Sequence, residues 1–78
     1  MREDLPRVLT EALKANGDKG TIVEVCRYIW QNYSGELKKS GDLFYTWQYD
    51  VRWAATNLRE NGVMKTVDES QKGIWELL

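Results

Sequence analysis

Apolar residues recur at helical spacing in three stretches of the chain. In the first stretch, an apolar row begins beside Asp4 and Pro6 and ends at Asn16-Gly17. Its members stand at positions i, i+3, i+4, i+7 and i+8, the spacing of one helical face: Leu5, Val8, Leu9, Ala12 and Leu13. Because proline suits the first turn of a helix and Asn-Gly suits its end, this pattern predicts a helix over about 5–16.

The second apolar row follows a polar segment, 16–20, that is typical of a turn. Thr21 and Glu24 have the spacing of a capping box, in which each side chain accepts a hydrogen bond from the backbone N–H of the other residue. The apolar positions behind it are again spaced for one helical face: Ile22, Val25, Cys26, Ile29, Trp30 and Tyr33. Ser34-Gly35 is typical of a helix end, so we expect a helix over about 21–33.

A third helix is predicted over about 44–61. Its apolar face has four members: Trp47, Val51, Ala54 and Leu58. Asn61-Gly62 provides the C-terminal stop. The stretch 35–43 before this helix has little that could be buried, and we expect it to be a solvated loop or a short extra turn.

After the third helix the apolar pattern changes from a period of 3.6 residues to a period of 2. Segments 63–67 and 73–77 have the pattern of short strands, and the polar segment 68–72 joins them. An isolated two-stranded hairpin is not stable in water, so we expect the face with Trp75 and Leu77 to pack against the helices.

Taken together, the elements predict an α+β fold in which three helices precede a two-stranded β-hairpin wing, the order of a winged helix. A chain of 78 residues can bury one modest core, so a single domain over 1–78 is expected. The chain shows no internal repeat or linker.

Composition argues against catalysis. There is no histidine, no cluster of thiols and no glycine-rich phosphate loop, so we expect no enzyme activity, metal, cofactor or small-molecule substrate. The single cysteine, Cys26, cannot form an internal disulfide. Because no apolar run near 18 residues and no signal-like N-terminus is present, we expect a cytoplasmic protein without membrane insertion.

The last third to half of the chain resembles a known family. Segment 49–63 contains Val-Arg-Trp-Ala, then a leucine, then a glycine that closes the helix, and segment 72–77 ends in Gly-Ile-Trp-Glu-Leu. This pattern is similar to the N-terminal winged-helix domain of Mrr-type restriction-system proteins. The resemblance implies a DNA-binding head, usually joined to a separate nuclease domain, with Gly62 as helix stop and Gly73 as wing bend. It also implies these core residues: Val51, Ala54, Leu58, Trp75 and Leu77.

Double-stranded DNA is therefore the first partner to consider, with the third helix in the major groove. The candidate DNA-contacting residues are its outward row, two lysines before it and one in the wing: Tyr45, Gln48, Tyr49, Arg52, Thr56, Arg59, Lys38, Lys39 and Lys72. Arginine can bond guanine bidentately, glutamine can bond adenine, and hydroxyl groups can reach phosphates. The plainer alternative is that the arginines are solvated helix residues and the tyrosines are half-buried.

Charge weakens the DNA interpretation. Eleven Lys plus Arg against twelve Asp plus Glu give a formal net charge of −1, which argues against tight non-specific DNA binding. The predicted wing tip, Asp68-Glu69, is acidic, and we interpret it as a solvated turn because two adjacent carboxylates make a weak cation site.

The alternative is a winged helix that binds a protein partner or forms a homodimer through exposed aromatic residues. Exposure of Tyr45, Tyr49 and Trp53 as one patch, or dimerisation through the first helix, would favour it. Large aromatic side chains usually bury most of their surface, so we expect Trp53 to pack under the wing. For the same reason we expect a second group, on the middle helix, to be buried: Trp30, Tyr33 and the small apolar side chain of Cys26.

Overall fold

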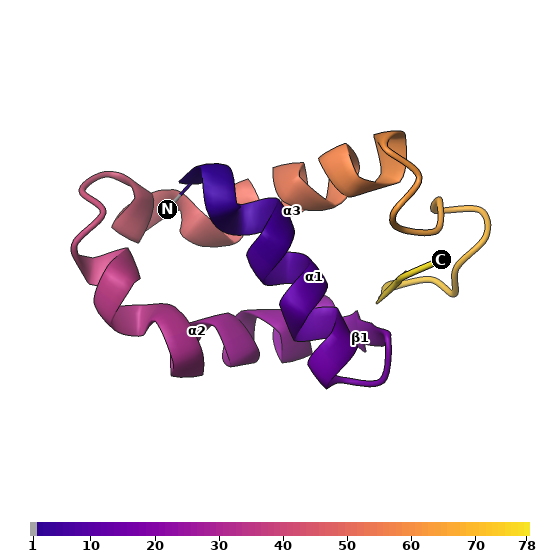
Figure 1. The fold of residues 1–78 in the computed structure, drawn as a ribbon, viewed down its shortest axis with the longest axis horizontal. Helices are drawn as coiled ribbons and strands as arrows, with labels where there is room; N and C mark the ends of the chain where they lie inside the picture. Colours follow the sequence, from indigo (N-terminus) through magenta and orange to yellow (C-terminus); the bar gives the residue numbers. More distant parts are fainter. Residues whose placement is uncertain (1) are drawn as a thin grey trace.

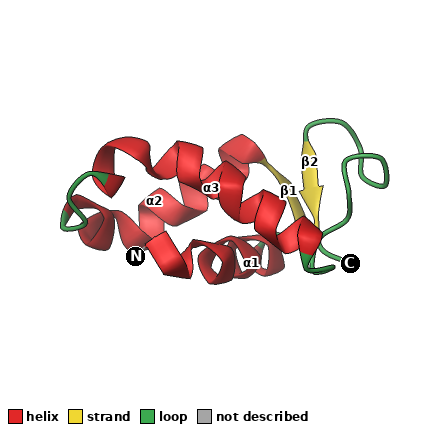
Figure 2. Ribbon diagram, turned by 90° about the horizontal axis from the view of Figure 1, so that it is seen from above, coloured by secondary structure: helices red, strands yellow, loops and turns green. Residues whose placement is uncertain are grey.

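The computed structural model describes residues 2–78 and has three helices beside a small antiparallel sheet (Figure 1). The elements follow in the order η1 (Arg2–Asp4), α1 (Leu5–Ala15), β1 (Lys19–Thr21), α2 (Ile22–Lys38), α3 (Leu43–Glu60) and β2 (Ile74–Glu76). The helices α2 and α3 run in opposite directions, and α1 crosses them. Both strands lie at the end of the domain remote from the α2–α3 connection (Figure 2). The domain is α+β, as predicted.

The prediction for α1 is confirmed. All five members of its apolar row are buried. Pro6 lies in the first turn, where its missing N–H costs no hydrogen bond. The helix ends at Ala15 with Asn16 as its C-cap, and the next residue, Gly17, has a φ of 78°, a conformation that glycine adopts without strain.

The capping box at the start of α2 is also confirmed. The Thr21 hydroxyl accepts the Glu24 N–H at 3.1 Å, and the Glu24 carboxylate accepts the Thr21 N–H at 2.8 Å. The predicted end of this helix is wrong: α2 runs through Ser34-Gly35 to Lys38, so half of the expected loop is helical. Leu37 in this last turn is fully buried. Burying a leucine is worth about 1.5–3 kcal/mol, which exceeds the cost of about 1 kcal/mol for a glycine inside a helix.

A carboxylate on α1 ties this helix to α2. The Glu11 Oε2 atom accepts hydrogen bonds from the hydroxyl groups of Tyr28 at 2.9 Å and Tyr33 at 2.7 Å. These bonds, with help from the nearby Arg7 guanidinium, lower the pKa of Glu11, and the Glu11 bonds raise the pKa of both tyrosines. Tyr33 is therefore half-buried as a hydrogen-bond donor and is not a fully buried core residue.

The predicted pairing of segments 63–67 and 73–77 as a hairpin is wrong. β2 pairs antiparallel with β1, a strand that lies partly in the expected turn, with Lys19 opposite Glu76, Gly20 opposite Trp75 and Thr21 opposite Ile74. Segment 63–67 contributes only an isolated bridge, between Met64 and Leu77. Its second half turns away because Thr66 begins a tight turn held by Glu69, whose carboxylate accepts the Thr66 N–H and hydroxyl at 3.1 Å.

The core lies between the three helices and extends under the sheet. α3 contributes the predicted Trp47, Val51, Ala54 and Leu58, together with Leu43 and Ala55. Met64 and Trp75 extend the core under the sheet, whereas Leu77 is only partly buried against it. The predicted stop at Asn61-Gly62 is confirmed, with Gly62 at a φ of 74°. With its inner face so occupied, α3 presents its opposite face outward.

Candidate nucleic-acid interface

The outward face of α3 carries most of the predicted DNA-contacting side chains. Tyr45 is 83% exposed and Tyr49 is 59% exposed. Gln48, Arg52 and Thr56 are exposed as well. The helix starts and ends one residue earlier than predicted, but its buried side includes the predicted apolar row, so the outward face is the predicted one as well.

The face divides into a polar flank and an aromatic flank. Gln48 and Arg52 lie on the side of α3 that faces α2, where both line a groove between the two helices. Tyr49 and Trp53 lie on the other side, where their rings meet edge to face at 6.2 Å beside η1 and the first residues of α1. The predicted DNA-contacting residues of α3 therefore lie beside two different parts of the fold, Gln48 and Arg52 beside α2 and Tyr49 beside η1 and α1.

Trp53 corrects an expectation, because it is 59% exposed and does not pack under the segment that follows α3. That segment folds back on the α2 side, where Lys72 and Asp68 line a pocket with Ile22 of α2 and Arg59 of α3. Trp53 lies on the opposite flank, beside the Tyr49 ring and the N-terminal residues Arg2, Leu5 and Pro6. More than half of the Trp53 surface is therefore left uncovered by the described residues 2–78.

Arg59 is less available than the sequence suggests. Its side chain is half-buried, and its Nε–H donates to the backbone carbonyl of Lys65 at 3.3 Å. This bond holds the segment after α3 against the last turn of the helix. Arg59 therefore keeps its positive charge at this end of α3 while one of its donors has a structural role.

The lysines of the predicted site lie at the two ends of this face. Lys38 and Lys39 are exposed at the end of α2, in the connection that leads into α3. Lys72 is exposed in the loop before β2. The four cations, Lys38, Lys39, Arg52 and Lys72, do not line one common face, because Lys38 reaches the Trp30 ring beside α3 whereas Lys39 lines a pocket with Arg2 and Glu3. None of the four forms an ion pair with another residue of the described range 2–78.

One of the two acidic side chains in the predicted wing tip, Glu69, has a structural role in the loop. Glu69 accepts two bonds from Thr66, which lower the pKa of its carboxylate. Its charge is therefore used to cap the turn over residues 66–70. Asp68 next to it is exposed.

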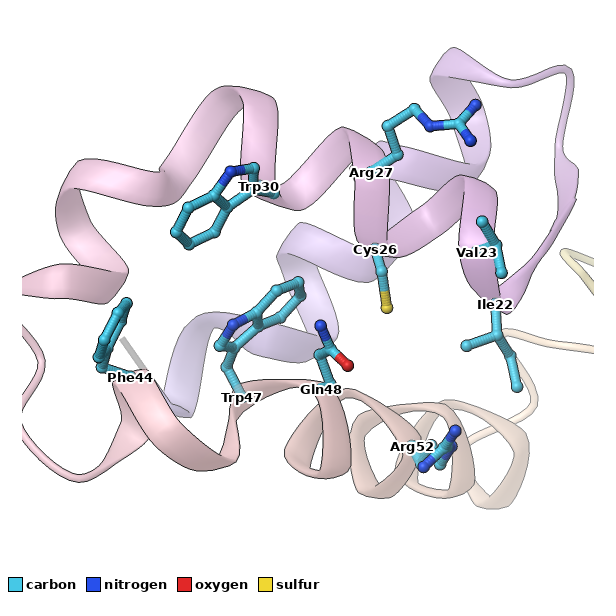
Figure 3. Close-up of a pocket in the computed structure, with 9 residues that line it drawn as sticks. All are labelled: Ile22, Val23, Cys26, Arg27, Trp30, Phe44, Trp47, Gln48 and Arg52. Atoms are coloured by element: carbon cyan, nitrogen blue, oxygen red, sulfur yellow. The ribbon is translucent and has the colours of Figure 1, made fainter.

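The groove between α2 and α3 has a volume of about 690 Å³ and is lined largely by apolar side chains (Figure 3). Three aromatic rings occupy one end: Trp30 stacks on Trp47 with centroids 6.3 Å apart and planes 13° apart, and Phe44 lies 6.5 Å from Trp30. The thiol of Cys26 points between the helices toward α3. Arg52 rises from α3 on the far side of that thiol from the rings.

Two side chains of this groove differ from expectation. Trp30 is 40% exposed, since Trp47 fills the space between the helices and covers only one of its faces. Cys26 is half-buried and lines the groove wall. Burial raises the pKa of its thiol, while the Arg52 guanidinium acts in the opposite direction.

Comparison with protein-family models, with curated proteins and with solved structures gives no match.

Within residues 2–78, no three Cys, Asp or Glu side chains come together as metal ligands. In the same range, no helix has the length and apolar character needed to cross a bilayer. The most conspicuous surface features are thus the outward face of α3 and the groove beside it.

Sequence reasoning missed the residues of the groove wall on α2. Val23 and Arg27 are exposed there, Val23 at 64%, and neither was singled out. A signal was present, because Val23, Arg27 and Trp30 stand at i, i+4 and i+7 and so share one helical face. Phe44, at the start of α3, was also missed, although it stands at i, i+3 and i+7 with Trp47 and Val51 of the predicted apolar face.

Proposed function

We propose that this domain is a winged helix that binds double-stranded DNA through α3 and performs no catalysis. The observation that carries the proposal is the outward face of α3, where Gln48, Arg52 and Thr56 are exposed along a helix whose opposite face is buried. A helix held in this way can enter the major groove, about 12 Å wide, without unfolding any part of the core.

The chain topology supports the winged-helix assignment. The helices α2 and α3 are joined by a short turn, as in a helix-turn-helix unit. β1 lies between the first two helices in sequence and pairs with β2, while the Met64–Leu77 bridge places the segment after α3 on β2 as well. In this proposal the loop over 65–73 serves as the wing. The resemblance to the N-terminal domain of Mrr-type restriction-system proteins supports the same assignment and suggests a DNA-binding head of a restriction or regulatory system.

The distribution of charge supports contacts to the DNA backbone at both ends of α3. Lys38 and Lys39 precede the helix, Lys72 follows it, and Arg52 stands between them without an ion-pair partner in the described range. Few contacts of this kind, on a chain with a net charge of −1, imply modest affinity that decreases with added salt.

Binding of a short fluorescent duplex, measured by anisotropy as salt is increased from low concentration, tests this proposal. Arg52→Ala should weaken binding about 5- to 100-fold if the guanidinium reads a base. Replacing Lys38 and Lys39 by alanine should weaken binding to all sequences alike and reduce the salt slope by about one for each phosphate that is no longer neutralised. Lys14→Ala, at the exposed end of α1, is the matched control and should have no effect.

Absence of binding at low salt would exclude the proposal. Equal effects of the Arg52 and Lys14 substitutions would exclude α3 as the contact helix. Each variant must first be shown to unfold at the same denaturant concentration as the wild type, because a change in stability could also reduce binding.

The exposure of Tyr45, Tyr49 and Trp53 favours a second candidate function, binding of a protein partner or of a second copy through these rings. Sedimentation of the protein over a range of concentrations tests the second-copy form. A dimer that Trp53→Ala dissociates would support this candidate, and a monomer at all concentrations would exclude self-association.

A further inference from the structure

The groove between α2 and α3 combines an apolar floor with charge of one sign only. Six of its nine lining residues have apolar or thiol side chains: Ile22, Val23, Cys26, Trp30, Phe44 and Trp47. Its only charged lining residues are Arg27 and Arg52. This local balance differs from that of the whole chain, which has one more acidic than basic residue.

A third cation lies at the aromatic end of this groove. The Lys38 Nζ atom stands 5.6 Å from the centre of the Trp30 ring, within the range of a cation–π contact. Arg27 points away from α3 at the outer rim, and Arg52 stands opposite it on α3 (Figure 3). Cations therefore occupy both rims and one end of the groove.

We propose that the α2–α3 groove docks an acidic peptide segment that inserts one or more apolar side chains against Trp30. The proposal goes beyond DNA binding and does not depend on it. Charge complementarity sets the acidic character of the partner, because the groove offers only cations to its charged groups. The apolar floor requires that the peptide bury at least one apolar side chain, as helices do when they bind in hydrophobic grooves.

A peptide fits this groove better than a DNA backbone does. A phosphodiester chain has charge for the arginines but no apolar group to cover Val23 or Trp30, which are 64% and 40% exposed. An acidic peptide with a phenylalanine or leucine satisfies both requirements. Arg52 is common to this groove and to the outward face of α3, so an acidic peptide and duplex DNA are expected to compete for the domain.

The test is a titration of isotopically labelled protein with a synthetic peptide of about 12 residues, long enough for three helical turns, that carries Asp and Glu around one Phe. Amide and indole N–H signals of Trp30 and amide signals around Cys26 and Arg52 should shift. Trp30→Ala should weaken binding by roughly tenfold or more, as is usual for an aromatic anchor. Trp53→Ala, on the other flank of α3, is the matched control and should have no effect.

Two substitutions that introduce opposite charges at Val23 keep the test valid if Trp30→Ala impairs folding. Val23→Glu should weaken binding of the acidic peptide several-fold, and Val23→Lys should strengthen it. Val23 is in the first turn of α2, where a helix favours negative charge, so the expected binding effects run opposite to the effects on helix stability. Loss of folding therefore cannot mimic the expected pattern.

Several outcomes would overturn the proposal. Equal binding of a peptide with Lys in place of its acidic residues, or of one with Ser in place of Phe, would show that the groove does not recognise that chemistry. Shifts at Trp30 and Cys26 with duplex DNA but not with the peptide would assign the groove to DNA. Because the peptide titration contains no DNA, its failure leaves the DNA-binding proposal standing, and failure of DNA binding leaves this one standing.

Discussion

Replacing Gly35 by alanine tests the unexpected length of α2. Sequence pattern places this glycine at a helix end, where it would adopt a positive φ, but the structure places it inside the helix without one. A Cβ atom at position 35 would meet no heavy atom within 4 Å, so the substitution has no steric cost. Alanine is favoured over glycine in a helix interior by about 0.8–1 kcal/mol, and we expect Gly35→Ala to stabilise the protein by nearly that amount.

Gly62→Ala is the matched control. A Cβ atom at position 62 also meets nothing within 4 Å, but Gly62 has a φ of 74°. The two substitutions therefore differ in backbone conformation alone. An L-residue in the left-handed region costs about 1–2 kcal/mol, so Gly62→Ala should destabilise the protein by that amount.

Urea unfolding followed by far-ultraviolet ellipticity measures both effects as changes in the free energy of unfolding. For a domain of this size, each kcal/mol corresponds to about 4–8 °C in Tm, so a thermal scan should resolve the opposite signs. A Gly35→Ala variant that is less stable than the wild type would refute the reasoning and place the end of α2 where the sequence pattern put it.

Three further predictions concern the helices and their contacts. Leu37→Ala should lower the free energy of unfolding by about 2–4 kcal/mol in the same urea assay, because it leaves a cavity under the last turn of α2; a loss below about 1 kcal/mol would show that this turn does not pack on the core. Thr21→Ala should lower it by about 1 kcal/mol through loss of the capping box, and an unchanged value would contradict the cap. The folded-state pKa of Glu11 is lowered, so its contribution to stability is present above the unfolded-state pKa and is lost as pH decreases through the folded-state value. Glu11→Gln should therefore lower the free energy of unfolding at pH 7 and flatten its decrease between about pH 5 and 3. Urea unfolding of both proteins across that range measures this, and an identical pH profile for the two proteins would contradict the prediction.

Competition between the two proposed ligands tests whether the outward face of α3 and the α2–α3 groove share Arg52. If Arg52 serves both duplex DNA and an acidic peptide, saturating peptide should reduce the apparent DNA affinity measured by anisotropy. In the Val23→Glu variant the peptide should compete less well. Simultaneous binding without mutual effect would show that Arg52 does not contact both ligands.

Local signals predicted a large part of the fold because they act between residues three or four apart. The apolar row of α1, the Thr21 and Glu24 capping box and the stop at Gly62 are all of this kind, and the structure confirms each. The outward face of α3 was predictable for the same reason: once its buried row is known, the helical period fixes which residues point away.

Signals of the same local kind were wrong where a distant partner decided the outcome. Ser34-Gly35 has the composition of a helix end, but the helix continues past it because Leu37 in the next turn is buried in the core. The strand pattern of 73–77 was recognised, yet its partner was β1, more than fifty residues earlier in the chain, which no local pattern indicates.

The sequence by itself determined the three helices, most of their ends and the side chains that α3 turns outward, because these follow from period and from capping between near neighbours. Only the tertiary structure decided which outward side chains stay uncovered. Trp30 and Trp53 look like core residues in the sequence, and they are exposed because Trp47 fills the space beside one and the segment after α3 folds away from the other. Exposure depends on what lies across from a residue, and that neighbour is set by the packing of the whole chain.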